Sequence, residues 1–345
     1  MLNVGILGAT GYSGQELIRL LHHHKEVTIK KIISDTYKEK QYKFVYRNFV
    51  GFNEELCKQV EWDSLTDDID LLFSALPYGV LMEKLTYDMM QKVKIIDIGV
   101  DYRFMDKETY KAYYHKEHKS IELVNKFTYG LSEWNEERIK ESSYVASPGC
   151  YATAIQLALL PLIKENMIET DIIVDGKCGL SGGGRTLTVG THFAEANEST
   201  KAYKINNHPH SFEAKKGIEY FTDESVSLTF TPHIVPMQRG MLITAYLELK
   251  SKVSHQTIKE IYNEYYKTKP FIEVLDQGIY VETKWVKNSN MCHINFEVNE
   301  ETNKLIVVAA IDNLIKGAAG QAVQNMNIMF GYPQNMGLDY IPICI

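Results

Sequence analysis

The 345-residue sequence predicts an α/β fold in two domains, with a parallel sheet in the first half and a mixed, largely antiparallel sheet in the second. Three observations support this prediction. Short apolar strands alternate with helices over residues 1–149, a glycine-rich turn joins the first strand to the first helix, and strands separated by turns dominate after residue 150. A chain of this length is long enough to bury a core in each of two domains.

The first half reads as repeated strand–helix units. Leu2–Leu7 is a short apolar strand, and a helix with one apolar side is expected from Gln15 to about His23. Further strands rich in Val, Ile and Leu are expected at Val27–Ser34, Asp70–Leu76 and Val93–Gly99. Apolar runs bounded by turn residues are typical of parallel strands that are covered on both faces.

The turn between the first strand and the first helix is G-A-T-G-Y-S-G, from Gly8 to Gly14. A strand, a glycine turn and a helix in this order are typical of a Rossmann-type NAD(P)-binding domain, although a plain turn remains the alternative. In such a turn the backbone can approach a pyrophosphate closely. Because ligands of parallel sheets bind at the strand ends, the candidate cofactor contacts are Gly8, Thr10, Gly11, Tyr12, Ser13, Gly14, Ser34 and Pro77.

The second half changes character. Its expected strands are Asp171–Cys178, Val226–Thr231, Leu242–Leu249, Cys292–Val298 and Lys304–Ile311, interrupted by only one long helix, Ser254–Lys267. This pattern predicts an α+β domain with helices on one face of a mixed sheet.

The predicted domain boundary lies near residue 149. We expect residues 1–149 to form the dinucleotide-binding domain and residues 150–316 to form a second domain, which the family resemblance described below implies is the catalytic and dimerisation domain. A last apolar helix begins in the small-residue segment at Gly317, and we expect residues 317–345 to complete the first domain.

The segment S-P-G-C-Y-A-T, from Ser147 to Thr153, places Cys150 at the start of an apolar helix. A thiol there meets backbone N–H groups and the positive end of the helix dipole, so it ionises more readily and can act as a nucleophile. A buried, inert cysteine is the alternative.

Three polar clusters follow in the second half. The glycine loop Cys178–Arg185 contains Ser181 and Gly182 and can present N–H groups to a cofactor or phosphate, or can be a flexible turn. His210 and Glu213 lie three residues apart at a predicted helix start, so the carboxylate could orient the imidazole; two surface histidines are the alternative. A third cluster ends a strand with His233 and Arg239.

Composition excludes several classes of protein. The net charge of −7 includes no basic stripe, so we expect no nucleic-acid partner, and no apolar run approaches the ~20 residues that cross a bilayer. Five scattered cysteines without a C-x-x-C pair indicate neither a disulfide framework nor a zinc site, and the cytoplasm is the expected compartment. The histidine run His22–His24 is expected to end the first helix rather than to bind a metal.

Taken together, the motifs resemble the N-acetyl-gamma-glutamyl-phosphate reductase family, a sister of aspartate-semialdehyde dehydrogenase. The resemblance spans essentially the whole chain. It rests on motifs in the family's order: G-A-T-G-Y-S-G, A-L-P-Y-G, Y-G-L-S-E, S-P-G-C-Y-A-T, G-L-S-G-G-G-R, H-P-H-S-F-E, F-T-P-H and D-N-L-I-K-G-A-A-G-Q-A-V-Q-N-M-N.

The resemblance implies an NADPH-dependent reduction of an acyl phosphate in arginine biosynthesis, by a homodimer or homotetramer built through the second domain. It implies that Cys150 is the nucleophile, that His210 works with it beside Glu213, and that Ser181, Gly182 and Asn313 contact the cofactor. Because a guanidinium matches phosphate and carboxylate, three arginines are candidate substrate contacts and their division between the two anions stays open. The candidate substrate contacts are Arg103, Ser147, Arg185, His208 and Arg239.

Some residues depart from the family pattern, and other readings remain open. Pro209 stands where an arginine is usual, and Phe212 where a proline is usual. Asp35 lies where an acid binds the ribose of NAD, whereas the resemblance implies NADP, with Lys38 among the nearby lysines that could offset the charge. The alternatives are an aspartate-semialdehyde dehydrogenase, another acyl-phosphate reductase, or a dinucleotide-binding sensor without catalysis.

Overall fold

The computed structural model describes residues 1–53, 55–104 and 106–342, and the chain divides into two compact units. The first unit contains Met1–Pro148 and Ala318–Leu338, and the second contains Gly149–Gly317 and the chain from Asp339 onward. Cys344, one of the five cysteines, lies outside the described residues. Among the described helices, none is long and apolar enough to span a membrane.

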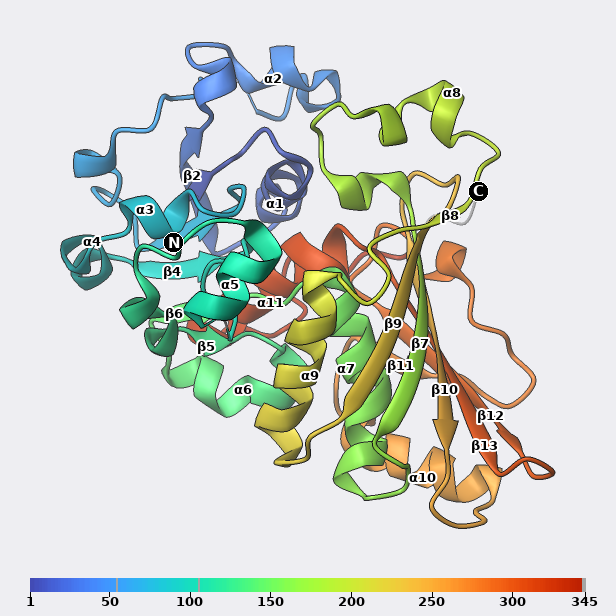
Figure 1. The fold of residues 1–345 in the computed structure, drawn as a ribbon. Coiled ribbons are helices and arrows are strands. Elements are labelled where there is room, and N and C mark those ends of the chain that lie inside the picture. Colours follow the sequence, from blue (N-terminus) through green and yellow to red (C-terminus); the bar gives the residue numbers. More distant parts are fainter. Residues whose placement is uncertain (54, 105, 343–345) are drawn as a thin grey trace. The chain divides into compact units, whose positions relative to one another are not determined.

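The first unit is built on a six-stranded sheet in the order β2-β1-β3-β4-β6-β5, and all its strand pairs are parallel (Figure 1). The prediction of a parallel, Rossmann-like sheet is therefore confirmed. Its elements are β1 Leu2–Leu7, α1 Tyr12–His22, β2 Val27–Ile33, α2 Tyr42–Val45, β3 Leu71–Ser74, α3 Leu81–Lys84, α4 Tyr87–Lys92, β4 Lys94–Asp97, α5 Lys107–Tyr114, β5 Thr128–Tyr129, α6 Ser132–Glu141, β6 Tyr144–Ala146 and α11 Gly320–Met329.

The first helix begins earlier than expected. It starts at Tyr12, inside the glycine motif Gly8–Gly14 and directly after Gly11, rather than at Gln15. It ends at His22, with that basic side chain in its last turn, and His24 is buried with its Nε2 2.9 Å from the Asn327 side-chain oxygen. The histidine run therefore ends a helix, and in the described parts of the chain no group of three or more His, Cys, Asp or Glu could hold a metal ion.

Helix α11 packs inside the first unit, and every one of its residues is buried. Its amide side chains bond to the segment before α6: Gln321 Nε2 and Asn325 Nδ2 each donate to the Gly130 carbonyl at 2.9 Å. These bonds satisfy polar groups that would otherwise be costly to bury. A short π-helix, Ile315–Ala319, precedes α11.

The second unit is built on a seven-stranded mixed sheet in the order β11-β12-β13-β10-β7-β9-β8. Four of its six strand pairs are antiparallel, and β11–β12 and β7–β9 are parallel, which confirms the predicted mixed sheet. Its elements are α7 Cys150–Lys164, β7 Asp171–Cys178, α8 Phe193–Ala196, β8 Lys201–Ala202, α9 Pro209–Thr222, β9 Ser227–Ile234, β10 Met241–Glu248, α10 His255–Tyr266, β11 Ile272–Val274, β12 Cys292–Asn299 and β13 Lys304–Ile311.

The expectation of only one long helix between these strands is wrong. Helix α9 runs for 14 residues in addition to α10, and Figure 1 shows α7 and α9 side by side along the sheet. Proline at the first position of α9 suits a helix start because its ring fixes φ and its missing N–H is not needed there.

Helix α7 is the buried centre of the second unit, although it contains Pro161. A proline inside a helix removes the N–H that would bond to the carbonyl four residues earlier, here that of Leu157. The Tyr266 hydroxyl donates to this carbonyl at 2.6 Å, and the Tyr262 hydroxyl donates to the next carbonyl, of Ala158, at 2.6 Å. Helix α10 thus supplies donors where α7 lacks one.

Candidate active site

Cys150 is the first residue of α7, and Gly149 is its N-cap with extended backbone. The thiol is therefore attached at the end of the helix where N–H groups lack intrahelical acceptors and where the dipole is positive. The side chain is partly buried. The position expected from the sequence, in the first helical turn, is confirmed.

Glu213 bonds to the residue that precedes the thiol. Its Oε1 accepts the Gly149 N–H at 2.8 Å, and the side chain is almost wholly buried, with 1% exposed. Helix α9 is held against α7 by Gln156, whose Nε2 donates to the Glu213 carbonyl at 3.2 Å. Glu213 therefore fixes the start of α7 directly, a contact that the sequence analysis did not anticipate.

His210 packs edge-on against the same glycine. A Cβ atom built on Gly149 would lie 2.4 Å from His210 Nε2 and 2.7 Å from both Cδ2 and Cε1. A Cβ atom essentially never lies this close to a non-bonded neighbour, so a larger residue at position 149 would displace the imidazole. The structure thus brings three of the expected residues together at one helix start: His210, Glu213 and, one residue beyond Gly149, Cys150.

His208 lies beside this group in a different role. It is the N-cap of α9, where its Nδ1 accepts the His210 N–H at 3.2 Å. Burial above all, and then the neighbouring His210 and Lys204, lower the pKa of His208 to about 2, partly opposed by Glu213. A neutral imidazole suits an acceptor at a helix N-terminus. The geometry therefore makes His208 the cap that sets the backbone position of His210.

The glycine loop after β7 is tied to the turn before β10 and to Asn313. Leu180 N donates to the Met237 carbonyl at 2.9 Å, and Ser181 N donates to the Gln238 carbonyl at 3.1 Å. The Asn313 side chain donates to Ser181 Oγ at 3.0 Å and accepts the Gly240 N–H at 2.8 Å. Asn313 therefore links two loops through both ends of its amide.

Cys178, at the end of β7, lies against this loop. A Cβ built on Gly182 would lie 2.8 Å from its Sγ. Burial, and secondarily the nearby Cys150 and Asp312, raise the pKa of the Cys178 thiol well above its usual value. Cys178 is thus a protonated thiol that packs as a small apolar group.

Arg239 is held by an acidic partner that the sequence analysis did not single out. Its Nε and Nη2 lie 3.1 and 3.0 Å from the two carboxylate oxygens of Asp312, whose side chain is fully buried. Asp312 also accepts the N–H groups of Asn288, Leu314 and Ile315 at 2.8, 2.8 and 3.1 Å. This bidentate pair fixes the Arg239 fork within the fold.

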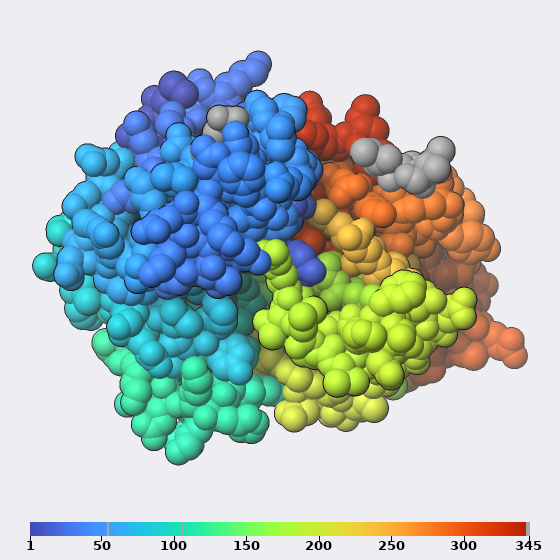
Figure 2. Space-filling model, turned by 90° about the horizontal axis from the view of Figure 1, so that it is seen from above, coloured from blue at the N-terminus to red at the C-terminus, as the bar shows by residue number. Residues whose placement is uncertain are grey.

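Arg185 lies instead at the start of an exposed excursion, residues 184–205, which appears yellow-green at the surface of the second unit in Figure 2. Large apolar side chains of this segment face solvent: Leu187 is 96% exposed and Phe193 is 77% exposed. Of the candidate arginines in this unit, Arg185 is the one whose side chain is open to solvent.

In the first unit, the loop Gly8–Gly14 has the packing expected of a phosphate cradle. A Cβ on Gly14 would lie 2.4 Å from the Gly8 carbonyl oxygen, so the helix start can approach the strand only with glycine there. A Cβ on Gly11 would have no protein atom nearer than 3.4 Å, which leaves that side of the loop open to a ligand. Tyr12 and Ser13 are the first helical residues, and the N–H groups of a first turn have no intrahelical acceptor.

The residues after β2 are engaged within the unit. The Ser34 hydroxyl lies 2.7 Å from that of Thr10, and Asp35 Oδ1 accepts the Val60 N–H at 2.9 Å. Pro77 lies exposed beyond the end of β3.

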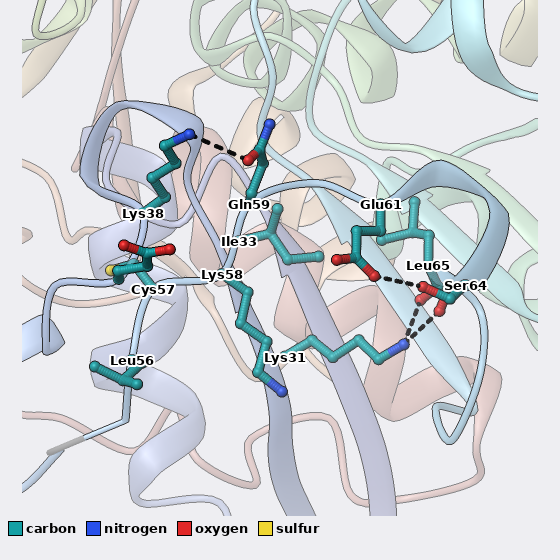
Figure 3. Close-up of a pocket in the computed structure, with 11 residues that line it drawn as sticks. Lys31, Ile33, Lys38, Leu56, Cys57, Lys58, Gln59, Glu61, Ser64 and Leu65 are labelled. Atoms are coloured by element: carbon teal, nitrogen blue, oxygen red, sulfur yellow. Dashed lines mark hydrogen bonds between the residues drawn. The ribbon is translucent and has the colours of Figure 1, made fainter.

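A shallow pocket of roughly 410 Å³ follows the edge of β2 (Figure 3). Its polar groups bond to one another: Lys38 donates to Gln59 at 3.3 Å, and Lys31 donates to the Ser64 and Leu65 carbonyls at 2.6 and 3.1 Å. These contacts fix the segment that runs alongside β2.

Arg103 and Ser147 are both buried at the carboxyl ends of strands in the first unit. Arg103 Nη2 donates to the Ile98 carbonyl at 2.5 Å, and Ser147 N donates to the Asp97 carbonyl at 2.8 Å. Burial, and next the charge of Asp101, raise the pKa of Asp97 to about 7, partly opposed by Arg103.

Two family models match the chain. One, described as the NAD binding domain of semialdehyde dehydrogenase, matches residues 3–142, and the other, described as its dimerisation domain, matches residues 150–313.

Curated relatives match at nearly full length. N-acetyl-gamma-glutamyl-phosphate reductase of Lachnoclostridium phytofermentans is 46% identical over 344 residues, and that of Thermoanaerobacter pseudethanolicus is 44% identical over 343 residues, each with 99% of both chains covered.

Solved structures show the same fold at low identity. Aspartate semialdehyde dehydrogenase II of Vibrio cholerae, complexed with ASA, superposes with a TM-score of 0.72 at 16% identity, covering 96% of this chain and 98% of that one. The NADP complex of the Candida albicans enzyme gives 0.72 at 17% identity, covering 97% and 99%.

Proposed function

The chain belongs to the N-acetyl-gamma-glutamyl-phosphate reductase family, and from this premise we propose that it reduces N-acetyl-L-glutamyl 5-phosphate with NADPH. The products are N-acetyl-L-glutamate 5-semialdehyde and phosphate, in arginine biosynthesis. One observation carries the proposal beyond the relatives' names: Cys150 begins α7 directly after Gly149, which His210 and Glu213 contact from α9. A nucleophile, a proton carrier and a helix N-terminus are thereby combined.

The acyl step uses the Cys150 thiolate. It attacks the acyl carbon, a C–S bond forms, the C–O bond to phosphate breaks, and phosphate leaves with the electron pair. His210 holds the thiol proton during the attack and balances the thiolate charge. The N–H groups of the first turn of α7 stabilise the negative charge that develops on the acyl oxygen, an effect of roughly 3 kcal/mol per donor in other enzymes.

The second step releases the aldehyde from the thioester. When bound, the cofactor supplies a hydride to the thioester carbonyl carbon. The same N–H groups then stabilise the oxyanion of the thiohemiacetal, which collapses by breaking the C–S bond. Cys150 departs as a thiolate and regains its proton from His210, which restores the starting state.

The first unit fits the dinucleotide. Gly11 leaves one side of the loop open, and the start of α1 presents N–H groups to a pyrophosphate. We assign cofactor contacts to Gly8, Thr10, Gly11, Tyr12, Ser13 and Gly14, and, in the second unit, the nicotinamide side of the site to Ser181, Gly182 and Asn313.

We propose NADP rather than NAD as the preferred cofactor. An acid after β2 favours NAD when its carboxylate accepts the ribose 2′-hydroxyl. Here Asp35 Oδ1 already accepts the Val60 N–H, and Lys38, Lys40 and Lys43 follow it closely. The ratio of kcat/KM for NADP and NAD tests this proposal, and a clear preference for NAD would overturn it.

Among the candidate arginines, the structure supports Arg185 best as the anion contact. The fork of Arg239 is held by Asp312, so we propose that Arg239 positions the turn that carries the Met237 and Gln238 carbonyls. Arg103 is buried in the first unit, where it bonds to the Ile98 carbonyl.

We propose a homodimer or homotetramer that pairs through the sheet of the second unit. Alternate residues of β7 are buried against the helices, whereas Ile173 on the other face is 49% exposed and Tyr246 on β10 is 40% exposed. Ile173 and Tyr246 are cross-strand neighbours and lie among the charged side chains of Asp171, Asp175 and Lys177 on this face, and we propose these two exposed side chains as the centre of the interface. Light scattering should give a molar mass in solution of at least twice the 39.5 kDa of one chain. The substitution Tyr246→Glu should lower this molar mass.

The decisive assay runs the reaction backwards, as phosphate-dependent reduction of NADP with N-acetyl-L-glutamate 5-semialdehyde. L-aspartate 4-semialdehyde serves as the competing substrate. We expect a kcat/KM at least about 100-fold higher for the acetylated substrate, in line with a pocket that must pair the extra polar groups. Equal or reversed preference would point to aspartate-semialdehyde dehydrogenase, and NADP binding without turnover would point to a sensor.

A further inference from the structure

The cofactor loop of the first unit is held by two tyrosines from outside the strand–turn–helix motif. The Tyr42 hydroxyl donates to the Ala9 carbonyl at 2.9 Å, and the Tyr46 hydroxyl donates to the Thr10 carbonyl at 2.8 Å. Tyr42 is fully buried and Tyr46 is partly buried. Both come from the segment around α2, which lies between β2 and β3 in the sequence (Figure 1).

This segment is itself firmly fixed. Tyr42 N donates to the Glu55 carbonyl at 2.9 Å, and Gln41 and Leu56 pair as a β-bridge. The ring of Tyr42 packs edge-on against that of Phe49, with centroids 5.1 Å apart, and Phe49 is 4% exposed. The two hydroxyls are therefore carried on a packed support rather than on a mobile loop.

The bonds act on two successive peptide planes. In a planar trans peptide the N–H points opposite to the C=O, so fixing the Ala9 carbonyl also fixes the Thr10 N–H, and fixing the Thr10 carbonyl fixes the Gly11 N–H. The Gly11 N–H donates to the Gly8 carbonyl at 3.0 Å, which closes the turn. The tyrosines thus determine the orientation of both planes at the centre of the glycine loop.

The orientation of the two carbonyl groups affects how strongly the loop binds an anion. A carbonyl oxygen carries partial negative charge and repels an anion, whereas an N–H attracts one. A hydroxyl that donates to each carbonyl draws it toward the α2 side and offsets part of its charge. A loop that already has this conformation does not lose affinity to the cost of ordering on binding.

We propose that Tyr42 and Tyr46 are positioning residues that hold the Ala9 and Thr10 carbonyls away from the cofactor's pyrophosphate and keep the loop in its binding conformation. This inference rests on the proposed dinucleotide binding by the first unit. It assigns a role in cofactor affinity to residues about 30 positions after the glycine motif.

The test compares Tyr46→Phe and Tyr42→Phe with Tyr87→Phe, a control on the exposed face of α4 in the same unit. The dissociation constant of NADPH is measured by nicotinamide fluorescence without substrate, and KM and kcat are measured separately. For Tyr42→Phe and for Tyr46→Phe we expect the dissociation constant and the KM for NADPH to rise about three- to tenfold. This is the loss of affinity typical of one hydrogen bond. The kcat at saturating cofactor and the control should stay unchanged.

A second ligand separates positioning from general loosening. Adenosine 2′-monophosphate lacks the pyrophosphate, so its affinity should be the same in wild type and Tyr46→Phe. Equal losses for both ligands, or an unchanged NADPH constant in Tyr46→Phe, would overturn the inference. If Tyr42→Phe fails to fold, Tyr46→Phe still decides. If the wild type itself does not bind NADPH, the proposed function fails instead, and the two failures are thereby distinguished.

Discussion

The starts of α1 and α7 are held by opposite kinds of group. Before α1, the neutral hydroxyls of Tyr42 and Tyr46 donate to carbonyl oxygens. Before α7, the Glu213 carboxylate accepts the Gly149 N–H. One helix start keeps its N–H groups and its positive dipole for a ligand, whereas the other already has a negative partner.

The difference fits the charge of the group that we propose at each helix start, a pyrophosphate at α1 and a thiolate at α7. A pyrophosphate is permanently anionic, so a neutral support leaves the whole attraction available to it. In the proposed mechanism a thiolate at Cys150 forms and disappears during each turnover, and the carboxylate of Glu213, which bonds to the preceding residue, disfavours it. His210, packed against Gly149, is the cation that can offset that cost. The comparison therefore predicts that charge changes near α7 alter rates, whereas changes near α1 alter cofactor affinity.

The largest effect is expected for Cys150→Ser. A serine hydroxyl is a far weaker nucleophile than a thiolate at neutral pH, so reduction should be abolished while the NADPH dissociation constant stays within about twofold of wild type. Steady-state assays and cofactor titration measure the two properties. The matched control is Cys57→Ala, at a buried cysteine of the first unit, which should retain activity. Wild-type turnover in Cys150→Ser would rule out the covalent route.

The next effect is expected for His210→Asn. Losing the proton carrier should lower the rate of the acyl step by ~10²–10⁴ and raise the apparent pKa at which iodoacetamide alkylates Cys150. His208→Asn should do less, because His208 is held neutral as the N-cap of α9. Rapid-quench measurement of phosphate release gives the acyl rate. A larger loss in His208→Asn would reverse the assigned roles of the two histidines.

A smaller effect is expected for Glu213→Gln, which keeps an oxygen acceptor for Gly149 but removes the charge. The apparent pKa of Cys150 alkylation should fall, because the negative charge bonded to the residue before the thiol is removed, and kcat should change by less than about tenfold. Glu213→Ala leaves the buried N–H without its acceptor and should cost about 1–3 kcal/mol of stability. If Gln and Ala variants lose stability equally, the bond to Gly149 is not the contact that matters.

The smallest effect on turnover is expected from Asp97, whose charge affects stability and its pH dependence in the first unit. Because burial, and next the charge of Asp101, raise the pKa of Asp97 to about 7, the folded state keeps a proton that the unfolded chain releases near pH 4. The free energy of unfolding should therefore fall as pH rises from about 4 to 7, by at most about 1.4 kcal/mol per unit from this group, and then level off.

Urea unfolding at pH 5, 6, 7 and 8 checks this expectation. In Asp97→Asn the contribution should be absent, so the curve should be flatter than that of wild type. Asp88→Asn, on the exposed side of α4, should follow wild type. Parallel curves for wild type and Asp97→Asn would show that Asp97 is ionised throughout this range.

The sequence predicted elements best where one pattern runs without interruption. The predicted bounds of β1, β7 and β13 match the structure, because each is a run of strand-forming residues bounded by turns. Helix α9 was missed as a long helix, since it combines a proline start with Gly217 and two lysines instead of a continuous apolar stripe. The two-residue strand β5 depends on pairing with β6, which no local pattern records.

In the candidate site, too, local features were predicted from the sequence and long-range contacts were not. The place of Cys150 follows from helical spacing and a preceding Pro-Gly, both of which are local. The partner of Glu213 is a backbone N–H 64 residues earlier, and that of Arg239 is a carboxylate 73 residues later. A backbone partner has no residue identity to recognise, and a single sequence contains no signal for pairs so far apart.

Helix α11 has a consequence for how the molecule is made. The first unit needs Ala318–Leu338, and α11 is wholly buried in it, with Gln321 and Asn325 bonded to Gly130. A ribosome that has released only residues 1–148 has therefore produced a sheet whose covering helix is still some 170 residues away. The second unit, whose strands and helices lie between Gly149 and Gly317, has all of them before that helix emerges. The domain that begins first thus receives its last helix only after the second domain has received all of its own, and a chain terminated before α11 lacks a fully buried part of its NAD(P)-binding half.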